Sequence, residues 1–182
     1  MDMETLKEAI VTLHEQYRIP HIVVTSISLP NLGALPSLSV VGSTFTSKAE
    51  PRIFEIKIPA IDCFFSGTGD MFAALMLVRL REAVNNVEGL MKMNSWVSAD
   101  EVDATELPLA KACEKVLASM HEVLARTKVR RDAELDKYKG VDWEGDEKRK
   151  RLLESKAAEV RLVRNLDCLR NPDVKFRAER FP

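Results

Sequence analysis

An apolar run directly behind two glycines is the feature that most constrains what this chain can fold into. The run, Met71–Val78, is eight residues long, far below the roughly 20 apolar residues that a membrane-spanning helix needs. Almost every position in it is apolar, so a helix from Asp70 to about Val84 would have little polar surface, and we expect it to be deeply buried. The run therefore favours a globular protein with this helix in its interior.

The composition excludes several classes of protein. The 182 residues are 46% hydrophobic and 30% charged, with a formal net charge of −1, unlike a disordered chain, a collagen-like chain or a uniformly basic nucleic-acid binder. The acidic N-terminus lacks the profile of a signal peptide, and Cys63, Cys113 and Cys168 are too widely spaced for a zinc motif. We expect a cytoplasmic protein without a membrane partner.

Two kinds of apolar pattern predict a sheet. His21–Thr25 is short, β-branched and nearly continuous in apolar residues, which indicates a strand buried on both faces, as in a parallel sheet covered by helices. Leu38–Gly42 and Ile53–Ile58 are joined by a polar loop and favour an antiparallel hairpin at a sheet edge. In the second of them, apolar residues alternate with Glu55 and Lys57, which predicts that one face is solvated.

Helical spacing predicts two further elements. Residues 3–17 form an amphipathic helix with Asp2 as its N-cap. A long helix is expected after Thr105, its N-cap, with Pro108 tolerated in the first turn. The apolar stripe of that helix is Leu109, Cys113, Val116, Leu117, Met120, Val123 and Leu124.

The charge is uneven along the chain. Residues 1–125 carry 10 basic and 16 acidic side chains, whereas residues 126–182 carry 17 basic and 12 acidic ones. Residues 126–165 are expected to be a charged helix broken near Gly140–Gly145, followed by an edge strand at Val174–Ala178. The basic excess permits a polyanion-binding function. Because acidic residues interleave with the basic ones, a solvated helix of mixed charge is the favoured interpretation, with no nucleic acid as a partner.

The loop in front of the apolar run is suited to binding a phosphate group. Gly67 and Gly69 allow positive φ and close approach to a ligand. The amides of Gly67, Thr68 and Gly69 would lie at a helix N-terminus, where partial positive charge collects. Asp70 is placed to accept a proton from an attacking hydroxyl. The simpler alternative is a turn in which Asp70 only caps the helix.

A second segment is expected at the same place. Thr25 and Ser26 follow the predicted buried strand, and ligands of open α/β sheets bind at the carboxyl ends of strands. The chain has neither GxxxxGK[ST] nor GxGxxG, so a Walker or Rossmann phosphate site is excluded. His14 and His121 have no acid or serine near them in the sequence and are interpreted as packing or surface residues. Cys63 is interpreted as a small buried apolar residue.

These motifs together resemble the pyridoxal kinases of the ribokinase-like superfamily. The matching segments are His21–Ser26, Asp62, Gly67–Asp70, Met71–Leu75, Ala112–Val116, His121–Thr127, Arg161–Asn165 and Asn171–Phe176. The GTGD form of the glycine motif, with Phe-Ala-Ala behind it, is closer to pyridoxal kinases than the GAGD of the wider superfamily. The tail is most like that of fungal members, and residues 128–150 match least.

The resemblance implies an α/β fold. It corresponds to the C-terminal portion of a ribokinase-like three-layer α/β/α fold, with an antiparallel edge hairpin and long C-terminal helices. Residues 1–182 would form a single incomplete domain, in which 128–150 is a charged variable helix and loop segment. Because only the C-terminal part of such a kinase is matched, we expect exposed apolar surface and an isolated chain that is inactive.

The resemblance also implies an activity and a set of site residues. The activity is ATP-dependent phosphorylation of the 5′-hydroxyl of pyridoxal, pyridoxine or pyridoxamine, with Mg²⁺ on the phosphates, by a homodimer. Asp70 would be the catalytic base and contact the substrate, and Gly67, Thr68 and Gly69 would form the anion hole. ATP would contact these three residues and Thr25, Ser26, Ile61 and Asp62. No residue is implied as a direct metal ligand.

Two other functions are compatible with the same residues. The chain could be a non-catalytic nucleotide-binding or dimerising fragment, which would bind ATP without turnover. A hydroxymethylpyrimidine-type vitamin kinase shares the fold, and the residues that would choose between the two vitamins are not among the matched motifs.

Overall fold

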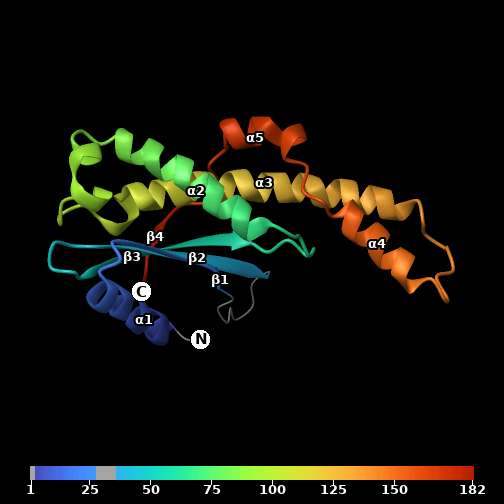
Figure 1. Ribbon diagram of the computed structural model, residues 1–182, viewed down its shortest axis with the longest axis horizontal. Helices are drawn as coiled ribbons and strands as arrows, with labels where there is room; N and C mark the ends of the chain where they lie inside the picture. Colours follow the sequence, from blue (N-terminus) through green and yellow to red (C-terminus); the bar gives the residue numbers. More distant parts are fainter. Residues whose placement is uncertain (1–2, 28–35) are drawn as a thin grey trace.

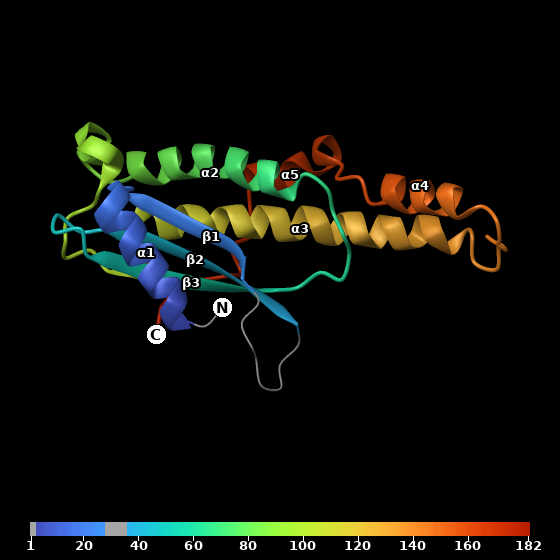
Figure 2. The same ribbon diagram turned by 60° about the horizontal axis from the view of Figure 1, so that its bottom comes forward.

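The computed structural model describes residues 3–27 and 36–182. Its described strands form one antiparallel sheet in the order β1-β2-β3-β4, made of His21–Ile27, Ser37–Phe45, Pro51–Pro59 and Glu179–Arg180. Helix α1 (Met3–Tyr17) lies on one face of the sheet, and α2 (Thr68–Asn85) and α3 (Pro108–Asp136) lie on the other (Figure 1 and Figure 2). The other elements are α4 Glu147–Ala157, α5 Leu166–Arg170 and the 3-10 turns η1 Leu90–Lys92, η2 Asn94–Trp96, η3 Ala104–Glu106 and η4 Leu162–Asn165.

Strand β1 lies at the edge of the described sheet. It pairs antiparallel with β2, and no described strand lies along its other edge. Val23 and Val24 are therefore only half-buried, and Thr25 and Ser26 are exposed. The prediction of a parallel strand buried on both faces is wrong for the described residues. A continuous apolar run indicates that a strand is covered, but it carries no information on the direction of the neighbouring strand.

Strands β2 and β3 form the predicted antiparallel hairpin, paired residue for residue over their nine positions. Its predicted place at a sheet edge is wrong for the described residues, because β1 pairs with β2 and β4 pairs with β3. The side chain of Phe54 on β3 lies across Gly42 on β2 and is fully buried. A Cβ atom at Gly42 would lie 2.2 Å from the Phe54 ring, so only glycine fits beneath that ring. The close approach of the two strands therefore depends on this pair.

The predicted solvated face of β3 is covered. Glu55 is only 2% exposed, and its carboxylate accepts a hydrogen bond from the Ser39 hydroxyl and lies 3.5 Å from the Lys57 ammonium group. The neighbouring carboxylate raises the pKa of Lys57, which is itself exposed as predicted. The predicted exposure is confirmed for Lys57 and wrong for Glu55. Glu55 is covered because helix α1 packs against this face of the sheet.

Two apolar clusters hold the layers together. Between α1 and the sheet lie Leu6, Ile10, Ile22, Ile27 and Val41. Between the sheet and α2 and α3 lie Val40, Phe54, Ile56, Leu107, Leu109, Ala110, Cys113 and Leu117. Helix α1 has the predicted bounds of 3–17, and Asp2, its expected cap, lies outside the described residues. These clusters confirm an α/β architecture with a helical layer on each face of the sheet.

Helix α2 is less buried than predicted. Phe72, Met76 and Leu80 pack against the core, but Leu77 is 71% exposed and Val78 62% exposed. Only Arg79 and Val84 are fully buried in this helix. Deep burial of the whole helix is thus wrong, because no described element covers its outer face. The expectation of exposed apolar surface is confirmed here.

Helix α3 begins later than predicted and is 29 residues long. Pro108 is its first residue, whereas Thr105 lies in η3, which Asp103 caps by accepting a hydrogen bond from the Thr105 amide. The second half of α3 and helix α4 extend beyond the sheet (Figure 1), and the expected break lies between them. Strand β4 is Glu179–Arg180, so the edge strand lies beyond the expected Val174–Ala178. No described helix is long and apolar enough to cross a membrane.

Candidate functional site

A cavity of about 390 Å³ lies between the N-terminus of α2, the end of β1 and the middle of α3. Five of the predicted site residues line it: Thr25, Ser26, Ile61, Thr68 and Gly69. Asp62, Gly67 and Asp70 are exposed and do not line it. The end of β1, at Thr25 and Ser26, and the N-terminus of α2, at Thr68 and Gly69, thus line the same cavity, as predicted from the sequence.

The N-terminus of α2 is open toward this cavity. Gly67 is its N-cap, with φ 77° and ψ 10°, and no side chain caps the helix. A Cβ atom at Gly67 or Gly69 would meet nothing within 4 Å, so space remains above the first turn. The first amides of a helix have no partner within it and attract negative charge. Positive φ is confirmed for Gly67, whereas Gly69 has negative φ and lies inside the helix.

The end of β1 departs from regular strand geometry at the residues that enter the cavity. Its pairing with β2 shifts between Val24 and Ile27, and Ser26 has φ 60°. Positive φ is uncommon for a residue other than glycine, and such bulges redirect side chains. Thr25 and Ser26 therefore reach the cavity through a bulge, which the amino-acid pattern did not reveal.

One face of α3 forms a further wall of the cavity. Leu117, Met120, His121 and Leu124 lie at successive turns of this helix and line the cavity. Burial lowers the pKa of His121. Helical spacing predicts Leu117 and Leu124 in the apolar stripe of this helix, and His121 is interpreted from the sequence as a packing or surface residue. The signal that could have found it was its position within that same stripe.

Asp70 and Asp62 lie outside the cavity. Asp70 is exposed in the first turn of α2, where a negative charge also favours the helix itself. The carboxylate of Asp62 acts on the Lys128 ammonium group, whose pKa is raised chiefly by Asp132 and to a lesser degree by Asp62. Among residues 3–27 and 36–182, no group of three or more His, Cys, Asp or Glu side chains is placed to hold a metal ion.

The cysteines differ from one another in burial. Cys63 lines the cavity and is only half-buried, so its interpretation as a buried apolar residue is wrong; it lies on the loop beside Phe64, which is 87% exposed. Cys113 and Cys168 are buried. Burial raises the pKa of the Cys113 thiol to about 12, which leaves it protonated and unreactive at neutral pH.

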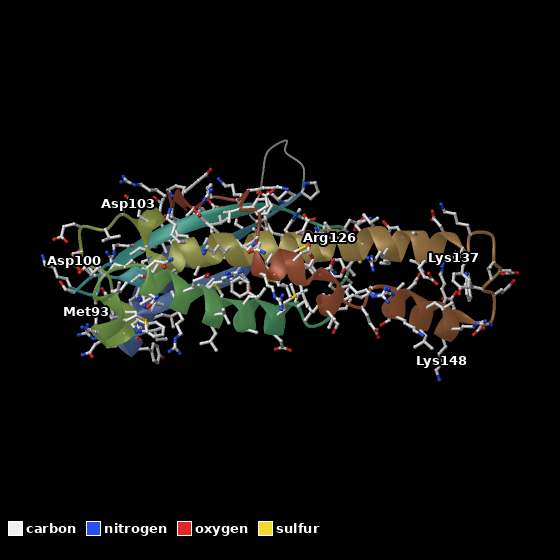
Figure 3. The ribbon with its side chains drawn as sticks, turned by 90° about the horizontal axis from the view of Figure 1, so that it is seen from above. Met93, Asp100, Asp103, Arg126, Lys137 and Lys148 are labelled. Atoms are coloured by element: carbon white, nitrogen blue, oxygen red, sulfur yellow. The ribbon has the colours of Figure 1, made fainter. Side chains whose placement is uncertain are left out.

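A larger cavity, of about 860 Å³, lies at one end of the molecule, around η1 and η2. Figure 3 shows Met93 and Asp100, which line it, at the end far from Lys137 and Lys148. Its ionisable side chains are Lys92, Glu88, Asp100, Glu101 and Glu106. This excess of negative charge disfavours a phosphate ligand, so the smaller cavity is the better candidate site.

The chain is similar in sequence to pyridoxal kinases. No family model matches it. A pyridoxal-kinase-like protein of Schizosaccharomyces pombe is 30% identical over 125 residues, which cover 69% of this chain and 35% of that protein. A second such protein of the same organism is 27% identical over 97% of this chain and 48% of its own length. The pyridoxal kinase of Arabidopsis thaliana is 27% identical over 88% of this chain and 38% of its own length.

Solved structures show the same fold. Pyridoxal kinase from Leishmania donovani in complex with ADP and pyridoxamine matches all of this chain and 45% of its own, with a TM-score of 0.60 and 17% identity. Plasmodium falciparum PdxK with AMP-PNP and PL matches 98% of this chain with a TM-score of 0.59. The chain spans less than half the length of these relatives. It is thus similar to the pyridoxal kinases in sequence and has the ribokinase-like α/β fold of the matching part.

Proposed function

We propose that this chain binds ATP in the cavity at the N-terminus of α2 and carries the catalytic base of a pyridoxal kinase. The observation that carries this proposal is the uncapped N-terminus of α2 beside a cavity that Thr25 and Ser26 also line. The relatives that match the chain, some of them in complex with ADP or AMP-PNP, support it.

The lining of the cavity suits both parts of a nucleotide. The amides of Thr68 and Gly69 and the hydroxyls of Thr25 and Ser26 can donate hydrogen bonds to phosphate oxygens. Most of the other lining side chains are apolar and can pack against the base: Leu38, Val40, Ile58, Phe72, Leu117, Met120 and Leu124. Apolar walls with a few convergent polar groups are typical of ligand sites. Ile61 is part of the loop that encloses this space.

Asp70 is the proposed catalytic base. Its carboxylate would take the proton of the vitamin 5′-hydroxyl as that oxygen bonds to the γ-phosphorus and the bond to the ADP oxygen breaks. Because Asp70 is exposed and does not line the cavity, the vitamin would approach the γ-phosphate from outside it. Gly67, Thr68 and Gly69 would stabilise the transferring group with their backbone amides.

Magnesium fits this arrangement as a partner of the phosphates. The carboxylates nearest the proposed phosphate position in the sequence are Asp62 and Asp70, and the described residues supply no three-donor cluster. Mg²⁺ is usually held by one or two carboxylates, water and substrate phosphates. When bound, the ion would offset the negative charge of the triphosphate.

Nucleotide binding and turnover are expected to separate in the isolated chain. The cavity is formed by described residues, but the outer face of α2 beside Asp70 leaves Leu77 and Val78 exposed. We therefore propose that the chain alone binds ATP without efficient turnover and that the vitamin is held with the help of polypeptide beyond it. A homodimer is part of the same proposal.

Two measurements on the purified chain test these statements. Calorimetric titration with Mg·ATP measures binding, and mass spectrometry of products from pyridoxal or hydroxymethylpyrimidine measures turnover and separates the two vitamin kinases. Asp70→Asn should retain ATP binding and remove any turnover, whereas Glu88→Gln, an exposed acid in the other cavity, should change neither. Absence of ATP binding would overturn the proposal, and turnover that survives Asp70→Asn would overturn the role of Asp70.

A non-catalytic nucleotide-binding fragment is the second candidate function. The position of Asp70 outside the cavity favours it. The two candidates differ in one result: any product that depends on Asp70 in the isolated chain would exclude the non-catalytic function.

A further inference from the structure

The α3 wall of the 390 Å³ cavity has one polar residue among its four. Leu117, Met120 and Leu124 present apolar side chains, and His121 lies between them at the same helical spacing. The His121 side chain is half-buried, so its ring nitrogens can bond either to water or to a ligand in the cavity. His121 therefore has a position at which a ligand could supply a hydrogen-bond partner.

The hydrogen bonds of the three histidines separate His121 from the others. Both ring nitrogens of His14 have partners, the Ile19 carbonyl at 2.6 Å and the Ser43 hydroxyl at 2.8 Å. Both ring nitrogens of His21 also have partners, the Thr44 hydroxyl at 2.9 Å and the Ser95 carbonyl at 2.7 Å. The ring of His121 makes no hydrogen bond to any residue in 3–27 or 36–182.

The His121 ring is nevertheless held in place. The ring of Phe176 packs edge-on against it, with 5.0 Å between the centroids and 69° between the planes. Phe176 in turn packs against the main core. The ring is therefore held in one position in the cavity wall, with nitrogens that no described residue bonds, and such a side chain can bond to a ligand without reorganisation.

The charge of His121 points to the base rather than to the phosphates. Burial lowers its pKa from 6.5, with Lys175 acting in the same direction and Glu122 opposing, so the ring is neutral at pH 7. A neutral imidazole has one donor and one acceptor nitrogen, which matches the donor and acceptor groups along the edge of a nucleobase. A phosphate would be better bound by a cation.

We propose that His121 hydrogen-bonds the base of the bound nucleotide. The proposal rests on the nucleotide binding proposed above. In this arrangement the phosphates would bond to the amides of Thr68 and Gly69, and the base would pack on the apolar side chains that neighbour His121 on α3 and line the same cavity. His121 is then a recognition residue with no part in the transfer of the phosphoryl group.

The test compares a ligand with a base and one without. The probes are ATP and inorganic tripolyphosphate, titrated calorimetrically into the wild type, His121→Phe, His121→Gln and, as a control on the same helix but outside the cavity, Val129→Ala; Val129 is 70% exposed. His121→Phe should weaken ATP binding about 3- to 10-fold, the value of one hydrogen bond, and leave tripolyphosphate binding unchanged. His121→Gln keeps a donor and an acceptor and should regain part of the loss, and Val129→Ala should alter the binding of neither ligand.

Three results would contradict the proposed role of His121, and one of them would also contradict the proposed function. If the wild type binds neither ligand, the proposed function fails as well. If ATP binds and His121→Phe has no effect, or weakens both ligands equally, only the role of His121 fails. The imidazole NMR signals of wild-type His121 provide a readout without any variant: they should shift with ATP and stay in place with tripolyphosphate, and an unchanged signal with bound ATP would overturn the proposal.

Discussion

Polar groups in the scaffold, by which we mean the residues away from the 390 Å³ cavity, differ from polar groups at the cavity in whether they are hydrogen-bonded within the protein. In the scaffold, the Arg79 guanidinium donates to the carbonyls of Leu169 and Arg170, and Arg52 donates to the carbonyls of Ala99 and Ser98. At the cavity, the α2 N-terminus has no side-chain cap, and His121 makes no hydrogen bond to a described residue. The scaffold uses its polar groups for stability, whereas those at the cavity remain available to a ligand.

The largest expected effect is a loss of folding stability when a buried polar group of the scaffold is replaced. Arg79→Met should lower the free energy of unfolding by about 2 kcal/mol, because two partly buried carbonyls lose the charged donor of a buried guanidinium group. Arg81→Met is the matched control: Arg81 is exposed, and the change should stay within about 0.5 kcal/mol. Urea denaturation measures both. Similar values for the two variants would show that the bonds of Arg79 do not stabilise the fold.

A substitution at the cavity should change ligand binding and leave the stability of the fold unchanged. Gly69→Asp should weaken ATP binding at least about 10-fold, because a carboxylate would lie where the phosphates are proposed to bind. Its unfolding free energy should stay within about 0.5 kcal/mol, since there is open space at the Cβ position and the first turn of a helix favours an acid. Gly69→Ala is the control for backbone effects. An Asp variant that binds ATP normally would place the phosphates elsewhere.

The buried histidines should make the scaffold sensitive to acid. Burial lowers the pKa of both His14 and His21 below the 6.5 of the unfolded chain, so the unfolded state binds more protons below pH 6.5. The stability they contribute is fully present above pH 6.5 and is lost as the pH falls below it. Urea denaturation at pH 7.5 and 5.5 should show the decrease, and His14→Asn should reduce it. An equal decrease in the variant would assign the effect to other groups.

The smallest effect is expected where exposed charges pair with each other. The Lys128 ammonium group lies 2.6 Å from the Asp132 carboxylate, one turn away on α3, and both side chains are partly exposed. Such pairs are worth roughly 0 to 1 kcal/mol, so Lys128→Met should change the unfolding free energy by less than about 0.5 kcal/mol. A thermal melt at low and high salt checks this. A loss as large as that of Arg79→Met would remove the distinction between buried and exposed polar groups.

The periodicity of apolar residues correctly predicted the elements that are defined by residues close together in the sequence. Helix α1 and the β2–β3 hairpin lie where periodicity placed them, because one helix face or one strand alternation is sufficient to define each. The break between α3 and α4 lies at the predicted glycines for the same reason. The start of α3 differed by a few residues, since both Asp103 and Thr105 are residue types that cap helices.

Features that depend on neighbours in space were not predictable in this way. The burial of Glu55 depends on α1 packing against its face of the sheet, and the exposure of Leu77 depends on the absence of a described element over α2. The direction of β1 depends on its hydrogen-bonding partner, β2. None of these neighbours is encoded within the few residues that form each pattern.

The sequence by itself determined the glycine turn before an apolar helix, the segments that resemble pyridoxal kinases and the candidate roles of Thr25, Ser26 and Asp70. Those features rest on residue type and short spacing, which a chain carries before it folds. Only the tertiary structure decided that Thr25, Thr68 and His121 line one cavity while Asp70 lies outside it. Packing of β1, α2 and α3 places residues almost a hundred positions apart around the same space, and the apolar contacts that do so are not local to any of them.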